Sequence, residues 1–428
     1  MREYRVGRNI SLSRRRSSPP SGPGYNIGCG SNPPAPVTRT SRKSRDHDAG
    51  YRVPPLPPPD GALTRAPQPH RDVPDDPVPL AGGVPGPDVV EYYRRRAAGG
   101  TALIVTEGVA IDHPTAVDNP RVPHMYGEAA LDGWRCVVDA VHAEGGRIVP
   151  QLWHVGPLWG AMTAQVDPNL TPMRPSGVWG EPGVTSYGEE YVTRASEPTR
   201  AMTTEDIEHV VAAYADAAAS AAQVGFDGIA LHGGHGYLLD SFLWEGTNLR
   251  DDEWGGDLER RTRFPAAVVA SIRSRIGENL PIFYRFSQHK QQNYEARIAR
   301  TPDELKAVLT PLAKAGVDVF DASIRRFDMP AFEGSDLTLA GWAKKVTGAL
   351  SMAVGSVGIA TSLRESRIQS AAPVRNNVPE LERRLVDDEF DLIAIGRLHL
   401  ADPSLATILR EGAELPEFDR TVHEATLI

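Results

Sequence analysis

The sequence predicts a (β/α)8 barrel, the TIM barrel of the α/β class. From about residue 102 to residue 396, seven short apolar runs alternate with longer amphipathic segments, and no break sets off a second domain. Each apolar run is nearly continuous rather than alternating, which is typical of parallel strands covered on both faces. Seven β-then-α units in succession therefore indicate a barrel with one strand still to be found.

The predicted strands are short and rich in β-branched residues. They cover residues 102–106, 147–153, 228–232, 281–287, 317–322, 351–355 and 392–396. The predicted helices between them cover residues 87–98, 131–143, 203–223, 260–276, 302–316 and 379–386. Suitable residues stand where these helices should begin. For example, Thr301 is a good N-cap, and Pro302 follows it at the first helical position. Proline costs nothing there, because the N–H of this position has no partner within the helix.

The first strand is poorly supported by the sequence. It should precede the helix predicted over residues 87–98, where residues 61–65 are the nearest candidate and form only a short stretch. Pro67, Pro69 and Pro74 follow this candidate. Proline lacks an N–H and is poorly tolerated in an interior strand, so these positions argue against regular structure there.

Composition divides the chain unevenly. The 428 residues are 40% hydrophobic and 24% charged, enough to bury a large core, but residues 1–88 hold 18 of the 37 prolines. Residues 1–52 carry 11 Arg or Lys against 3 acids, while the whole chain has a net charge of −9. We therefore expect a disordered or aberrant leader over residues 1–80, a barrel over residues 81–415 and a tail over residues 416–428.

Several classes of protein do not fit this composition. Two cysteines, Cys29 and Cys136, are too few to ligate an iron–sulfur cluster and form no disulfide framework, which favours a reducing, cytoplasmic compartment. No apolar run approaches the roughly 20 residues of a membrane span, and no signal peptide is expected. The basic leader lacks aromatic interleaving or a motif, so we expect no nucleic-acid partner.

Polar residues gather where the predicted strands end, which is where barrels carry their chemistry. His232, His235 and Tyr237 follow strand four, with glycines between and after the histidines that let the chain turn sharply. Two imidazoles could donate hydrogen bonds to a carbonyl oxygen, and a phenol could deliver a proton. An ordinary loop with a packed histidine is the alternative. A zinc site would need a third ligand, and none stands at a recognisable spacing, so no metal is expected.

Two further groups lie at strand ends. Residues 355–358 (GSVG) and Gly396-Arg397 follow the last two strands and suit a phosphate, because glycines admit backbone N–H groups and arginine adds a charged fork. The alternative is that these glycines only form turns.

Gln151 and Arg285 point into the same mouth of the predicted barrel. A glutamine amide there fits a pyrimidine-like edge, and a cation stabilises an anionic ring. For Arg285, the alternative is a structural salt bridge.

At these positions the sequence closely resembles the old yellow enzyme family of FMN-dependent ene-reductases. The longest match is LHGGHGYLLDSFLWEGTNLRDDEWGGDLERRTRF at residues 231–264. The other matching stretches are IVTEG (104–108), PQLWH (150–154), RFS (285–287), FEGSD (332–336), AVGSVG (353–358) and IGRLHLADP (395–403). The resemblance covers roughly residues 82–410 and implies that the barrel of residues 81–415 binds FMN.

The resemblance implies a role for each matching residue. His232 and His235 would hold the substrate carbonyl, and Tyr237 would be the proton donor. The implied FMN contacts are Gly108, Gln151, Arg285, Gly355, Ser356, Gly396 and Arg397. The implied activity passes a hydride from NADH or NADPH through the flavin to the C=C bond of an α,β-unsaturated carbonyl or a similar electron-poor small molecule. Whether the protein is a monomer or a homo-oligomer stays open.

One departure from the family is in the first strand. The family ends this strand in a Met-Ala-Pro-Met-Thr-Arg-like stretch that meets the flavin, and residues 62–65 (ALTR) are at best a remnant of it. Two other interpretations therefore remain beside ene-reduction. One is a flavoprotein of the same fold that catalyses an oxidation or isomerisation in a biosynthetic pathway, and the other is a barrel inactivated by loss of its first strand.

Overall fold

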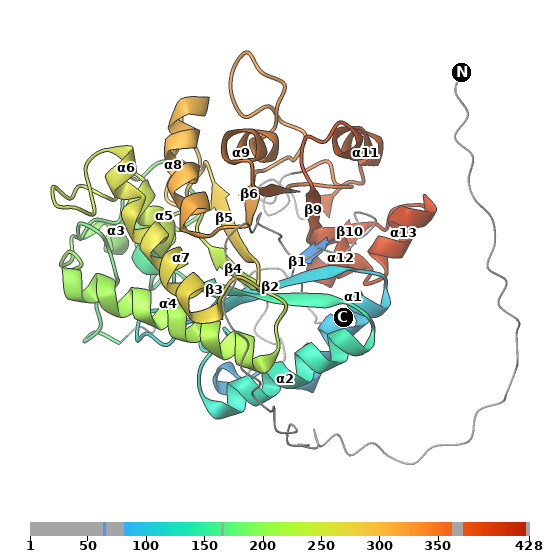
Figure 1. The fold of residues 1–428 in the computed structure, drawn as a ribbon, viewed down its shortest axis with the longest axis horizontal. Helices are drawn as coiled ribbons and strands as arrows, with labels where there is room; N and C mark the ends of the chain where they lie inside the picture. Colours follow the sequence, from blue (N-terminus) through green and yellow to red (C-terminus); the bar gives the residue numbers. More distant parts are fainter. Residues whose placement is uncertain (1–62, 66–80, 164–166, 362–370, 425–428) are drawn as a thin grey trace, which may run out of the picture. The chain divides into compact units, whose positions relative to one another are not determined.

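Eight parallel strands close into a barrel in the order β1-β2-β3-β4-β5-β6-β7-β9, which confirms the predicted fold class (Figure 1). The computed structural model describes residues 63–65, 81–163, 167–361 and 371–424. The barrel strands are β1 (Leu63–Arg65), β2 (Leu103–Ala110), β3 (Arg147–Trp153), β4 (Ile229–His232), β5 (Ile282–Ser287), β6 (Val319–Ser323), β7 (Leu350–Val354) and β9 (Leu392–Ile395). The seven strands predicted from apolar runs are all present.

The short candidate for the first strand forms part of the barrel. Leu63 pairs with Leu103 of β2 on one side and with Ala394 of β9 on the other, both in parallel. A strand of three residues thus closes the barrel and leaves no open edge between β2 and β9. It lies inside the stretch that composition assigns to the leader, whose residues 1–62 and 66–80 are outside the described part of the chain.

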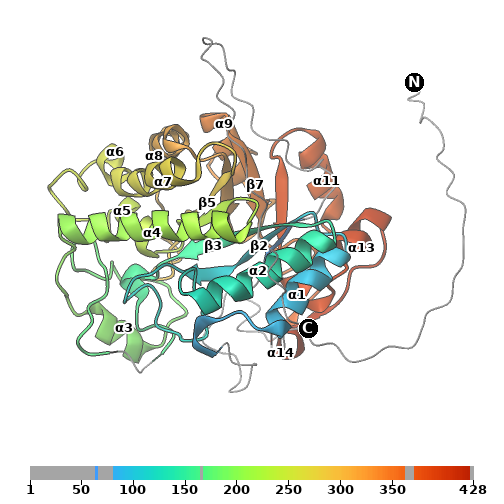
Figure 2. The same ribbon diagram turned by 60° about the horizontal axis from the view of Figure 1, so that its bottom comes forward.

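Amphipathic helices surround the barrel. They are α1 (Pro87–Ala98), α2 (Glu128–Ala143), α4 (Thr204–Val224), α7 (Arg263–Ile276), α8 (Pro302–Ala315), α9 (Leu339–Thr347) and α11 (Val378–Val386). Figure 2 shows α2 and α4 lying outside β2 and β3. Thr203 caps α4 through a capping box with Asp206, and Thr301 accepts a hydrogen bond from the N–H of Glu304 at the start of α8.

The remaining elements lie in loops and near the C-terminal end. They are the 3-10 turns η1 (Ala81–Gly83) and η2 (Gly156–Leu158), the helices α3 (Glu189–Ser196), α5 (Leu238–Leu243), α6 (Leu258–Arg261), α12 (Arg397–Ala401), α13 (Leu405–Glu411) and α14 (Arg420–His423), and the strands β8 (Ala371–Ala372) and β10 (Phe418–Asp419). The helix predicted over residues 260–276 is divided at Thr262 into α6 and α7. Within the described ranges, no helix is long and apolar enough to cross a membrane.

The core has two layers, and the inner one positions the site. A large cluster joins the strands to the surrounding helices, while a smaller cluster fills the barrel. The smaller cluster consists of Leu103, Val105, Val149, Ala230, Phe283, Val319, Met352 and Ala394, one or two residues from each of β2 to β7 and β9. Because side chains two positions apart share one face of a strand, the next inward-facing residues lie at the barrel mouth.

Candidate active site at the carboxyl ends of the strands

The inward-facing positions at the mouth are polar on β3, β4, β5 and β6, and on β6 the position is Asp321, two residues after the interior Val319. Gln151, His232 and Arg285 each follow an interior residue by two positions, namely Val149, Ala230 and Phe283. His232 is paired in register with Arg285, so their side chains are neighbours on the same face. The predicted residues of strands three, four and five therefore converge on one space above the filled part of the barrel.

Gln151 and Gly108 lie opposite each other in the register of β3 and β2. Gln151 is buried, and its side-chain amide donates to the carbonyl oxygen of Thr106 at 3.3 Å. A Cβ at Gly108 would lie 2.4 Å from the Trp153 ring, so a residue with a side chain could not occupy this position without moving the tryptophan. Glycine at position 108 thus leaves room for the buried Trp153 ring beside Gln151.

The Arg285 side chain is only 11% exposed. Its Nη2 donates to Ser323 Oγ at 2.7 Å, and its Nη1 lies 3.9 Å from the Asp321 carboxylate. Burial raises the pKa of Asp321, while the Arg285 guanidinium beside it opposes this shift. Nε of Arg285 has no hydrogen-bond partner within the part of the chain that the structure describes.

His232, His235 and Tyr237 meet after β4 as predicted. The ring centroids of His232 and His235 are 5.2 Å apart, and the Tyr237 ring is 4.7 Å from that of His232. All three residues are buried, and Trp153 packs edge-on against Tyr237 at 5.0 Å. Ser323 Oγ is 2.9 Å from His235 Nε2, so this serine links His235 to Arg285.

The turn after β4 depends on a left-handed backbone. His235 has φ of 64° and Gly236 has φ of 83°. A Cβ at Gly236 would lie 1.9 Å from Gln292 Oε1, so only glycine fits there. The sharp turn predicted at these glycines therefore requires glycine at position 236. After this turn, the Tyr237 side chain lies beside His232.

A buried ion pair holds the turn after β4 in place. Lys290 Nζ lies 2.7 Å from both carboxylate oxygens of Asp240, and neither side chain has any solvent exposure. Asp240 also accepts a hydrogen bond from the backbone N–H of Gly236 at 2.6 Å. The peptide between His235 and Tyr237 is therefore anchored to a charge pair that solvent does not screen.

The second predicted group lies after β7 and β9. Arg397 Nη2 donates to Ser356 Oγ at 2.9 Å, which joins the two strand ends. A Cβ at Gly355 would lie 2.3 Å from the carbonyl oxygen of Ile324, and Ser356 has φ of 50°. Gly396 directly precedes α12, whose first residue is Arg397. Asn377 supports the loop from both ends, donating to Ser356 O and accepting from Gly358 N–H.

Four residues of this region were not identified from the sequence. Ser323 is at the end of β6, and the polar strand-end rule that found the others would have found it too. Asn377, Asp240 and Lys290 carry no such signal, because their partners are distant in sequence or lie in a different loop. Within the described residues, no cluster of three or more His, Cys, Asp or Glu residues could hold a metal ion.

The NADH:flavin oxidoreductase / NADH oxidase family matches residues 81–415. The chain belongs to this family. Flavin oxidoreductase hxnT of Emericella nidulans is 32% identical over 343 residues, which are 79% of this chain and 84% of that protein. 12-oxophytodienoate reductase 7 of Oryza sativa is 38% identical over 208 residues, covering 46% of this chain and 49% of its own length. A solved structure of morphinone reductase has a TM-score of 0.64 at 27% identity and covers 85% of this chain and 88% of its own.

Family membership confirms the resemblance to the old yellow enzymes and the class of reaction. The chain is an oxidoreductase that uses FMN with NADH or NADPH as reductant, and the activity that its membership supports is reduction of activated C=C bonds. The residues at the mouth fit FMN. The unused Nε donor of Arg285 suits the anionic side of a flavin ring, and the Arg397–Ser356 pair supplies the kind of donors that a phosphate requires.

A buried histidine two residues after Arg397 is expected to make the free energy of unfolding depend on pH. His399 of α12 is 1% exposed, its ring nitrogens have no hydrogen-bond partner among the described residues, and burial next to Arg96 holds its pKa well below 6.5. Below pH 6.5 the unfolded chain binds a proton that the folded chain does not, so acid favours unfolding. We expect this histidine to lower the free energy of unfolding by up to about 1.4 kcal/mol per pH unit there.

Urea unfolding of the wild type and of His399→Leu across this pH window tests the expectation. The leucine variant should lose stability less steeply as the pH falls, by the equivalent of one proton. Equal slopes in the two proteins would mean that His399 is protonated in the folded chain.

Proposed function

We propose that FMN binds across the mouth of the barrel, with its pyrimidine edge at Gln151 and Arg285 and its phosphate at Ser356 and Arg397. The observation that carries this proposal is the shared inward face of β3, β4 and β5, which directs Gln151, His232 and Arg285 into one space. We also propose that FMN contacts backbone atoms of three glycines, which are Gly108, Gly355 and Gly396.

We propose that His232 and His235 bind the carbonyl oxygen of an α,β-unsaturated substrate and that Tyr237 protonates its α-carbon. FMN, when bound, would supply the redox chemistry, which is the transfer of a hydride from NAD(P)H to the β-carbon. The two imidazoles bind the oxygen more strongly as it becomes enolate-like than as a neutral carbonyl, and this differential binding lowers the barrier. The buried Trp153 ring excludes water from one side of the Tyr237 phenol.

Ser323 is suited to orient His235 for this task. Its Oγ accepts a hydrogen bond from Arg285, so its own proton is available to His235 Nε2 at 2.9 Å. A histidine that accepts at Nε2 carries its proton on Nδ1, where it can donate to the substrate oxygen. In this way the cation on the flavin side and the histidine on the substrate side are joined through one hydroxyl.

Anaerobic stopped-flow measurements with NADPH and cyclohexenone test the proposal. We expect NADPH to bleach the flavin absorbance and cyclohexenone to restore it in a second, separate mixing step. A protein that is bleached by NADPH but not reoxidised by cyclohexenone or other activated alkenes would contradict ene-reduction and favour an oxidation or isomerisation by the same fold.

The partners that we propose follow from the same site. A small molecule is the expected substrate, and neither a nucleic acid nor a membrane is expected as a partner. We also propose a cytoplasmic location, on the ground that two cysteines without a CxxC pattern suit a reducing compartment.

A further inference from the structure

A row of rings leads from the substrate-binding histidines to a cation. The His289 ring centroid is 5.0 Å from that of His235, and the Tyr294 ring is 5.9 Å from that of His289. The guanidinium carbon of Arg325 lies 5.0 Å from the Tyr294 centroid. His289 and Tyr294 belong to the loop after β5, and Arg325 follows the end of β6 by two residues. Two neighbouring loops thus build one wall beside the mouth.

The charge at the end of this wall has no acidic partner. Arg325 is partly buried, yet its side chain forms no ion pair or hydrogen bond with any residue that the structure describes. Its neighbour Arg326 differs, because it is paired with Asp328 at 3.0 Å. The Tyr294 ring holds the Arg325 guanidinium from one face and leaves its N–H donors unused.

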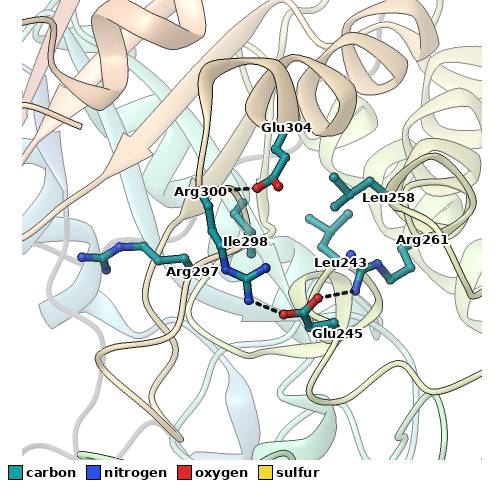
Figure 3. A pocket seen from close by; sticks show the side chains of 8 residues that line it. All are labelled: Leu243, Glu245, Leu258, Arg261, Arg297, Ile298, Arg300 and Glu304. Carbon is teal, nitrogen blue, oxygen red and sulfur yellow. Dashed lines mark hydrogen bonds and ion pairs between the residues drawn. The ribbon is translucent and has the colours of Figure 1, made fainter. Parts of the chain in front are cut away.

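A second cation nearby adds to the positive charge. Arg297 forms no ion pair within the described ranges, and in Figure 3 its side chain points away from Glu245, the carboxylate that holds Arg300 and Arg261. Burial is the main cause that lowers the pKa of His289 to about 3, followed by Arg325, Lys290, Arg285 and Arg297.

These four cations are not equally available to a ligand. Lys290 is neutralised by Asp240, and Arg285 has Asp321 beside it. Arg325 and Arg297 are the two cations acting on His289 that form no ion pair with a described residue. An anionic group is the kind of ligand that such a wall attracts.

We propose that Arg325 binds a carboxylate of the oxidising substrate, so that the preferred alkenes carry an acidic arm beyond the carbonyl that His232 and His235 hold. The inference rests on the proposed function, because it needs the carbonyl at the histidine pair. A guanidinium presents its donors in a planar fork that matches both oxygens of a carboxylate. Arg325 then determines specificity and takes no part in the chemical step.

Matched substrates test this role. They are alkyl vinyl ketones whose alkyl arm ends in a carboxylate, in a short and a longer version, each compared with its methyl ester as a neutral twin. Calorimetry on the oxidised holoenzyme measures Kd, and steady-state turnover measures KM. We expect the wild type to prefer the acid of at least one arm length by about tenfold, the effect of one charge-assisted pair. Arg325→Gln should abolish this preference and leave kcat for the ester unchanged.

Arg326→Gln is the control, since it removes an adjacent guanidinium that Asp328 already occupies, and it should retain the preference for the acid. Equal affinity of the wild type for acid and ester, or a preference that survives Arg325→Gln, would overturn the inference. An effect of Arg325→Gln on the Kd of NADPH alone would also overturn it and assign the cation to the reductant. Failure to reduce either ester would instead refute the proposed function, on which this inference depends.

Discussion

Replacing Tyr237 with phenylalanine should slow transfer to the alkene by about 10² to 10⁴-fold, the usual contribution of a positioned general acid. The variant loses only the phenolic hydroxyl and keeps the ring that packs on Trp153 and His232. Reduction of the flavin by NAD(P)H needs no proton from this group and should proceed at the wild-type rate. The expected result is therefore a split between the two half-reactions.

Anaerobic stopped-flow of each half-reaction measures the split. Tyr191→Phe is a matched control, because it removes another buried phenol whose ring packs on Trp179 instead of the histidines. It should leave both half-reactions unchanged. If Tyr237→Phe slows both steps equally, or neither, then Tyr237 is not the proton donor.

The second large effect concerns stability. Lys290→Met should lower the free energy of unfolding by about 3–5 kcal/mol, since it leaves the Asp240 carboxylate buried without its partner. Adding Asp240→Asn should recover part of this loss, because the double variant buries no charge and the asparagine oxygen can still accept from Gly236 N–H. Urea unfolding of both variants measures the two values.

Lys344→Met provides the comparison for this ion pair. Lys344 also lies near two carboxylates, at 2.6 Å from Asp388 and 2.9 Å from Asp391, but its side chain is 22% exposed. Water screens this cluster, so its loss should cost about 1 kcal/mol or less. If Lys290→Met costs no more than Lys344→Met, the pair with Asp240 does not hold the turn as described.

The sequence predicted the barrel strands because each is a short apolar run covered on both faces. The first strand was harder to predict. Leu63–Arg65 has only three residues, and its hydrogen bonds go to β2 and β9, which are far away in the chain. A strand whose stability comes from long-range pairing on both sides has little local signal. The division of the predicted helix at Thr262 was missed for another reason, because the apolar pattern continues across it.

The site was predictable where its residues follow strands and not where they support loops. Polar residues at the ends of apolar runs could be predicted, because a barrel carries its chemistry at the carboxyl ends of its strands. These residues include His232, Arg285 and Arg397. Asn377 and Lys290 act through partners that only the folded chain brings close, Gly358 in one case and Asp240 in the other. The sequence therefore predicted the polar residues at the mouth of the barrel, but it did not predict those that hold the surrounding loops in place.

The visible spectrum of the purified protein, taken after free flavin has been removed, tests most directly whether this barrel binds FMN at its mouth. The site described above predicts the absorbance band of bound flavin, either as isolated or after addition of FMN, and one FMN per chain on release and quantification. A protein that shows no flavin absorbance even after incubation with FMN would contradict the assignment of the mouth to this cofactor and, with it, the proposed reduction of activated alkenes.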